Sequence, residues 1–177
     1  VEISKHLKKL DPNSKVIFIG PCTAKKAEVR KEAVKPYVDL ALTFEELQAL
    51  FDSREIELAK LDEEPLDNAS YYGRIFARCG GLAEAVAEAL KEQGITEEQF
   101  KLNAVACDGI ANCRMALLKA QSGKREENFI EGMACINGCI GGAAALSHGP
   151  KNRLAVDKYG KEAKEKNIKD AIKVYEL

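Results

Sequence analysis

Short apolar stretches that alternate with amphipathic ones limit the fold of this chain more than any other feature. Val16–Ile19 is a fully apolar run that stops at Gly20-Pro21, as a central parallel strand would. Val38–Leu42 and Leu102–Ala106 are two more strand candidates. Because strands that alternate with helices form parallel sheets, we expect an α/β fold with mostly parallel short sheets flanked by helices.

Periodicity and end signals mark the helices. Thr43 and Glu46 form the two ends of a capping box, which predicts a helix through about Phe51. Gly80-Gly81 opens a second helix, and Gly94 fits its end. Further helices are expected over residues 3–10, 109–121 and 138–146, and in the tail from Lys151, where Ala163, Ile168, Ile172 and Val174 are available for packing.

Composition narrows the classes of function. A length of 177 residues suits one domain, which we expect to cover residues 1–177. A formal net charge of −1 and few aromatic residues argue against binding to nucleic acid. No apolar run approaches the roughly 20 residues that span a bilayer. The absence of a signal-like segment predicts a cytoplasmic protein with reduced thiols, and the start at Val1 suggests a piece of a longer protein.

Two cysteine motifs carry the chemistry of the chain. Cys22 follows the first predicted strand, and Cys135 and Cys139 lie in the run Met-Ala-Cys-Ile-Asn-Gly-Cys-Ile-Gly-Gly. Thiolates are soft ligands that suit zinc or an iron–sulfur cluster. The three residues are candidate ligands, although a metal site of this kind normally has four.

The spacing of Cys135 and Cys139 allows both thiols to face the same side of a turn that leads into a helix. A helix N-terminus at that point would stabilise thiolates and an anionic cluster. The glycines and alanines after Cys139 would let a cofactor or another backbone approach closely. The alternative is a packed Gly/Ala helix with two incidental buried cysteines.

Cys22 alone is a weaker signal, because a cysteine after a strand is often a buried filler. Lys25 and Glu28 follow it at a spacing that could place an amine near an anionic group and a carboxylate on a proton path. The alternative for both is a solvated first helical turn.

These residues resemble a known family. Pro-Cys-Thr-Ala-Lys-Lys-Ala-Glu from Pro21, Gly-Gly-Leu-Ala-Glu-Ala from Gly80 and the Cys135–Cys139 motif occur in the order typical of the iron-only ([FeFe]) hydrogenase large subunit, C-terminal domain. The resemblance covers nearly the whole chain. It implies a fold with the cluster site between two lobes and a parent chemistry of reversible H₂ oxidation and proton reduction.

The resemblance also implies residue roles. Cys22, Cys135 and Cys139 would bind a [4Fe–4S] cube, with Cys139 bridging to a two-iron subcluster. Lys25 would contact a cyanide ligand, Glu28 would belong to a proton path, and Met133 would pack beside the two irons. H₂, protons and an electron-transfer or signalling protein would be the partners.

The chain departs from the family pattern at several points. The Thr-Ser-Cys-Cys-Pro motif, which would supply the fourth ligand of the cube, is absent. Gly20 replaces a usual Met, and Ile136-Asn137-Gly138 replaces a usual Pro-Gly-Gly. Ala143-Ala144-Ala145 replaces a frequent Gly-Gln-Pro. Such changes resemble a divergent, sensory branch of the family.

Three hypotheses follow for the function. The first is a cluster-binding domain of a hydrogenase-like protein, which in this fragment would be inactive and poorly loaded with cluster. The second is a cluster module that senses H₂ or redox state without turnover, and the third is a structural zinc–thiolate site. Cys113, on a helical stripe with Ile110 and Leu117, is expected to be a buried filler, whereas the roles of Cys79 and Cys107 stay open.

Overall fold

The computed structural model describes residues 1–64 and 69–173. The chain divides into two compact units, and each is described by itself. The first unit comprises residues 1–62 and 142–147, and the second comprises residues 63–141 and 148–177. Within the described ranges, no helix combines the length and the apolar character that crossing a membrane requires.

The first unit is built around a parallel strand pair. Its elements are α1 (Glu2–Leu10), β1 (Ile17–Ile19), α2 (Lys25–Glu28), β2 (Leu40–Leu42), α3 (Phe44–Ser53) and the short 3₁₀ helix η1 (Leu58–Lys60). Ile17 pairs with Leu40 and Ile19 with Leu42, and α2 lies in the connection between the strands. The predicted capping box is confirmed, because the Thr43 side chain accepts from the Glu46 N–H while the Glu46 carboxylate accepts from the Thr43 N–H.

The prediction of a buried central strand is wrong for β1. Its three side chains, Ile17, Phe18 and Ile19, are between 37% and 48% exposed. Within the described residues β1 pairs with β2 alone, so it lies in a two-stranded sheet. The apolar run therefore predicted the strand and its parallel pairing, but not its burial.

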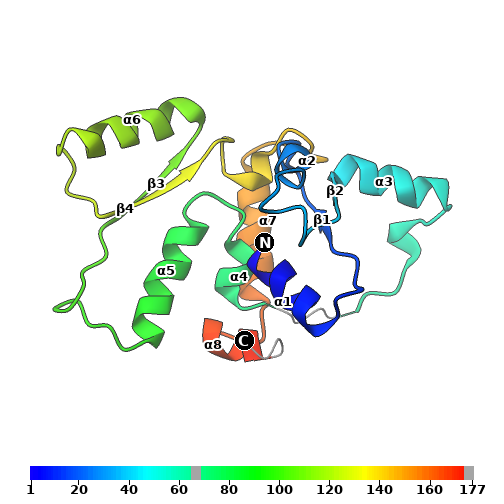
Figure 1. Cartoon of the computed structure of the whole chain (residues 1–177), viewed down its shortest axis with the longest axis horizontal. Coiled ribbons are helices and arrows are strands. Elements are labelled where there is room, and N and C mark those ends of the chain that lie inside the picture. The colour runs from blue at the N-terminus through cyan, green and yellow to red at the C-terminus, as the bar shows by residue number, and fades with distance from the viewer. Residues whose placement is uncertain (65–68, 174–177) are drawn as a thin grey trace. The chain divides into compact units, whose positions relative to one another are not determined.

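The second unit repeats the same plan around a longer strand pair. Its elements are α4 (Tyr71–Ile75), α5 (Gly81–Glu92), β3 (Ala104–Asp108), α6 (Ile110–Gln121), β4 (Phe129–Met133), η2 (Cys139–Gly141), α7 (Lys151–Lys161) and α8 (Ile168–Ile172). β3 and β4 are parallel, from the pair Ala104–Phe129 to the pair Asp108–Met133. α6 connects them on one side, and α5 lies on the other (Figure 1).

The core of the second unit depends on close packing of α4 against α7. Ile75 is fully buried, and a Cβ atom at Gly160 would lie 2.7 Å from the Ile75 Cγ2 atom. Only glycine at position 160 lets the two helices approach this closely. Of the predicted tail residues, Ala163 is buried, whereas Val174 lies outside the described residues.

The α/β prediction is confirmed, whereas the predicted helix over residues 138–146 is wrong. That segment contains only η2, a single turn, because its glycines have low helix propensity. After Gly141 the chain enters the first unit, where the Ala144 N–H donates to the Pro21 carbonyl over 3.1 Å. Cys135 and Cys139 therefore do not lie at the start of a long helix.

The Thr43 cap gives a test of this local structure. We expect Thr43→Ala to lower the free energy of unfolding by about 1 kcal/mol, because the first turn of α3 loses its side-chain acceptor. Denaturant titration measures the change. Ser53→Ala, at the exposed end of the same helix, serves as the control and should change stability by less; equal losses would contradict the role of the cap.

Candidate cluster-binding site

The second cysteine motif forms a loop at the carboxyl end of a parallel strand pair, which is where α/β folds place their sites. β4 ends at Met133, and Cys135 follows two residues later. The neighbouring strand ends at Asp108, whose Oδ2 atom accepts from the Asn137 N–H over 2.6 Å. One edge of the loop is therefore tied to the strand beside it.

The other edge of the loop pairs with the segment before α5. Arg78 and Gly138 form an antiparallel bridge, and the Cys79 N–H donates to the Asn137 carbonyl over 3.1 Å. The fit requires glycine at position 138, where φ is +82° and a Cβ atom would lie 2.6 Å from the Cys79 nitrogen. Bonds on both edges thus fix the backbone between the two cysteines.

A buried carboxylate supports the segment that pairs with the loop. Glu131, on β4, is 1% exposed. Its two oxygens accept from the N–H groups of Gly80 and Ala83, at 2.7 and 2.8 Å. Gly80 is the N-cap of α5 and Ala83 lies in its first turn, where N–H groups have no partner within the helix and favour a negative charge. Glu131 therefore joins β4 to the start of α5.

Arg78 stabilises the same segment through hydrogen bonds of its side chain. Arg78 is 3% exposed, and its guanidinium donates to the carboxylates of Glu84 and Asp157 and to the Cys79 carbonyl. Arg153 donates to that carbonyl as well, over 3.2 Å. Burial raises the pKa of the Cys79 thiol, and the charges of Asp108 and Glu131 add to this effect. Cys79 is thus a buried thiol on the segment that pairs with the loop.

In the first unit, Cys22 follows the carboxyl end of β1. The Gly20 N–H donates to the Leu42 carbonyl, and the Pro21 carbonyl accepts from Ala144. The Cys22 carbonyl then accepts from the Lys25 N–H over 3.3 Å, which starts the turn into α2. Backbone bonds on both sides therefore hold this short segment.

Lys25 and Glu28 form an ion pair on α2. The Lys25 ammonium donates to Glu28 and also lies 5.9 Å from the centre of the Phe18 ring. The hydrogen bond from Lys25 lowers the pKa of Glu28, so this carboxylate stays ionised at neutral pH. The two residues are about one third exposed, so solvent can still reach both.

The thiols differ in how open they are to a ligand. Cys22 and Cys135 are half-buried and Cys139 is exposed, and all six cysteines lie in the described ranges without forming a disulfide. The Cys113 thiol points to the carbonyls of Met133 and Cys107. The helical stripe that Cys113 shares with Ile110 and Leu117 was expected to be buried, but these two residues are 74% and 61% exposed. Among the residues described, no three His, Cys, Asp or Glu side chains form a group that could hold a metal ion.

The structure brings together some of the predicted residues. It pairs Lys25 with Glu28 and places Cys135 and Cys139 on one fixed loop, close in sequence to Met133. Cys22, Lys25 and Glu28 belong to the first unit, and the other three to the second. A ligand set that combines both units stays a prediction.

Sequence reasoning missed the residues that fix the loop. Glu131 interrupts an apolar strand, and a lone charge in such a strand could have drawn attention to it. The Asp108–Asn137 and Arg78–Asp157 contacts had no comparable signal, because the partners are 29 and 79 residues apart in sequence.

Glu131 gives a test of how the loop is supported. We expect Glu131→Ala to lower the free energy of unfolding by about 3 kcal/mol, because two N–H groups lose a charged acceptor inside the protein. Glu131→Gln keeps an acceptor and should lose less. Chemical denaturation measures the stability of both variants, with Glu126→Ala at an exposed position as the control. If Glu131→Ala lost no more stability than the control, the Glu131 carboxylate would not stabilise the start of α5.

Two glycines with similar backbone angles test the close approach at the loop. Gly123 has φ of +67°, and no atom lies within 4 Å of where its Cβ atom would be. At Gly138 a Cβ atom would collide with the Cys79 nitrogen. Gly123→Ala should cost about 1 kcal/mol for the left-handed backbone alone. Gly138→Ala should cost about 3 kcal/mol or more, because the Cys79 backbone must also move. Equal losses in unfolding experiments would mean that the loop and the segment of Cys79 are not packed together.

Comparison with known proteins identifies the family of the chain. The family model described as "Iron only hydrogenase large subunit, C-terminal domain" matches residues 2–143. Iron hydrogenase 1 of Clostridium pasteurianum is 28% identical over 84% of this chain and 31% of its own length. The NADP-reducing hydrogenase subunit HndD of Solidesulfovibrio fructosivorans is 29% identical over 75% of this chain and 28% of its own length.

Solved structures share the fold. An [FeFe]-hydrogenase whose H cluster is modified and degraded by oxygen superposes with a TM-score of 0.70 and 20% identity, over 99% of this chain and 60% of that one. The chain thus spans about a third of the length of its curated relatives. The match to residues 2–143 shows that the chain belongs to the family of the iron-only hydrogenase large subunit, C-terminal domain.

Proposed function

We propose that this chain is the iron–sulfur cluster-binding part of an [FeFe]-hydrogenase-like protein, with Cys22, Cys135 and Cys139 as ligands of a [4Fe–4S] cluster. The observation that carries the proposal is the loop between Cys135 and Cys139. Its backbone is held on one edge by Asp108 and on the other by the segment of Cys79. A loop fixed in this way presents two thiols without further ordering when a cluster binds.

The donor set fits an iron–sulfur cluster. Cysteine thiolates are the usual ligands of such clusters, and Cys22, Cys135 and Cys139 are all accessible in part. A structural zinc site would leave Lys25 and Glu28 beside Cys22 without a role, whereas an anionic cluster gives the Lys25 ammonium a charge to face. This chemistry favours the cube over zinc.

The remaining site residues have roles that their chemistry supports. When bound, the cube and a two-iron subcluster would supply the electron chemistry that interconverts H₂ with protons and electrons. Lys25 would direct its ammonium at an anionic ligand of the irons, and Met133 would pack beside them. Glu28 would accept a proton at its carboxylate, which the ion pair with Lys25 keeps ionised.

Hydrogen or redox sensing is a second candidate, and the Lys25–Glu28 ion pair favours it. A carboxylate whose pKa is lowered by a neighbouring ammonium holds a proton poorly at neutral pH. A carboxylate of this kind is poorly matched to proton transfer near neutral pH, which would suit a module that reports the state of a cluster to a signalling partner. A catalyst would instead exchange electrons with a carrier protein and use H₂ and protons as substrates.

Anaerobic reconstitution with iron and sulfide tests the ligand assignment. The 177-residue chain offers three thiolates of a set of four, so we expect poor loading that rises when a small thiol is added to supply the fourth ligand. Iron and sulfide per chain and the visible absorption band measure the loading.

Cysteine variants provide the controls for this experiment. Cys22→Ser, Cys135→Ser and Cys139→Ser should each reduce the iron bound, whereas Cys113→Ser should not, because its hydroxyl can still donate to the same carbonyls. A colourless protein that binds one zinc per chain would exclude the cluster. Robust H₂ evolution after maturation of a longer protein that contains this chain would exclude a purely sensory role.

A further inference from the structure

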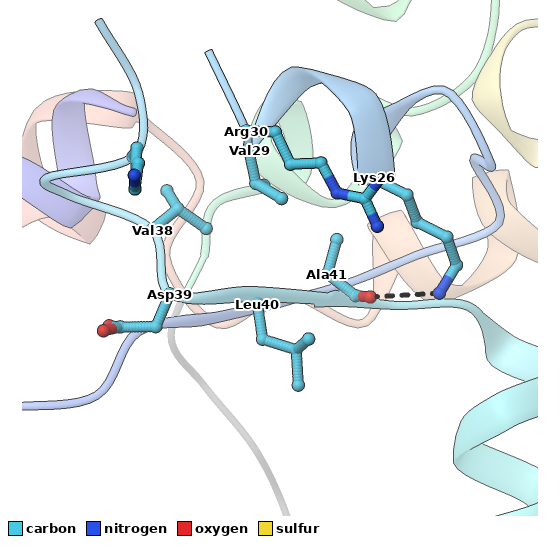
Figure 2. Close-up of a pocket in the computed structure, with 8 residues that line it drawn as sticks. Lys26, Val29, Arg30, Val38, Asp39, Leu40 and Ala41 are labelled. Atoms are coloured by element: carbon cyan, nitrogen blue, oxygen red, sulfur yellow. Dashed lines mark hydrogen bonds between the residues drawn. The ribbon is translucent and has the colours of Figure 1, made fainter. Parts of the chain in front are cut away.

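The first unit contains an open cavity of about 480 Å³ between the segment of α2 and one face of β2. Figure 2 shows Val29 and Arg30 on one side of it and Val38 and Ala41 on the other. The floor is lined by apolar side chains, of which Val38 and Ala41 are 5% and 3% exposed and Val29, half-buried, is the more accessible. Lys35 and Asp39 complete the rim. The volume lies in the range of small-molecule sites, roughly 300–1,000 Å³.

Two of the four charged residues around the cavity are already compensated. The Lys26 ammonium donates to both carboxylate oxygens of Glu46, at 2.6 and 2.7 Å, and more weakly to the Ala41 carbonyl. Asp39 accepts from the Lys8 ammonium and from the Val16 N–H, both at 2.8 Å. These bonds hold the pKa of Asp39 at about 2, so its charge stays paired with Lys8 at neutral pH.

The other two charged residues, Arg30 and Lys35, have no counter-charge. Throughout residues 1–64 and 69–173, neither side chain makes a hydrogen bond or an ion pair. Two cations beside an apolar floor attract a negative charge, most strongly at low ionic strength. A guanidinium also binds the planar edge of a carboxylate or phosphate through two parallel hydrogen bonds.

We propose that this cavity binds a small organic anion, whose phosphate or carboxylate group is held by Arg30 and Lys35 and whose apolar part lies on Val29, Val38 and Ala41. The inference is independent of the cluster, since none of the proposed cluster ligands lines the cavity. It adds to this chain a ligand site for a metabolite-sized anion.

A small molecule fits the cavity better than a macromolecule does. Nucleic-acid binding needs a wide basic surface, and the chain as a whole carries a net charge of −1. At this cavity the charge without a partner belongs to two residues, Arg30 and Lys35. The two cations are exposed, so binding should be moderate and should weaken as salt is added.

Calorimetric titration of the 177-residue chain with three probes tests the proposal. Phenyl phosphate and phenylacetate present the same apolar ring with a phosphate or a carboxylate, and inorganic phosphate has no ring. We expect a phenyl probe to bind more tightly than inorganic phosphate, because the apolar floor contributes. Phenyl phosphate as the tighter of the two would identify a phosphate ester as the ligand, and phenylacetate as the tighter would identify a carboxylate.

Charge-matched variants locate the binding. The double variant Arg30→Gln with Lys35→Gln should weaken binding by about tenfold or more. Lys9→Gln with Lys101→Gln removes the same charge at exposed positions outside the cavity and should leave binding nearly unchanged. Backbone amide shifts should map the probe to residues 26–41. The absence of binding by all three probes, or equal losses in both double variants, would overturn the proposal.

Discussion

The arrangement around the second cysteine motif depends on one buried carboxylate. Glu131 belongs to β4, yet both of its oxygens bind N–H groups in the first turn of α5. A charged group that is 1% exposed is costly to bury unless its hydrogen bonds are satisfied. Here the free N–H groups and the dipole of a helix N-terminus supply that compensation. The sheet and the helix therefore cannot shift relative to each other without exposing an unpaired charge.

The geometry of the cysteine loop follows from this contact. Because Glu131 fixes Gly80, it also fixes Cys79, whose backbone pairs with Asn137 in the middle of the loop. Arg78 continues the same network to Asp157 on α7. These contacts, from Asp108 on one edge to Cys79 and Arg78 on the other, all belong to the second unit.

Local signals in the sequence predicted the helices and strands well, whereas contacts between residues distant in sequence could not be predicted. The capping box of Thr43 and Glu46 was predictable because both partners lie within one helical turn. The helix expected over residues 138–146 failed because its alanines favour a helix but its glycines do not. The hydrogen bond from the Ala144 N–H to the carbonyl of Pro21, which is far away in sequence, stabilises the loop instead of a helix. Likewise, the apolar character of β1 could not reveal how little of the described chain covers it.

The structure explains how Asn137, a departure from the family pattern between the two cysteines, fits the turn. Asn137 stands where glycine is usual, and its φ of +66° lies in the left-handed region. Asparagine is one of the few other residues that adopt this conformation readily, so it fits this turn. Asp108 then binds the Asn137 N–H, and Gly138 retains the position where a side chain would collide with Cys79. The residue at position 137 therefore suits the left-handed backbone that the turn between Cys135 and Cys139 adopts in this chain.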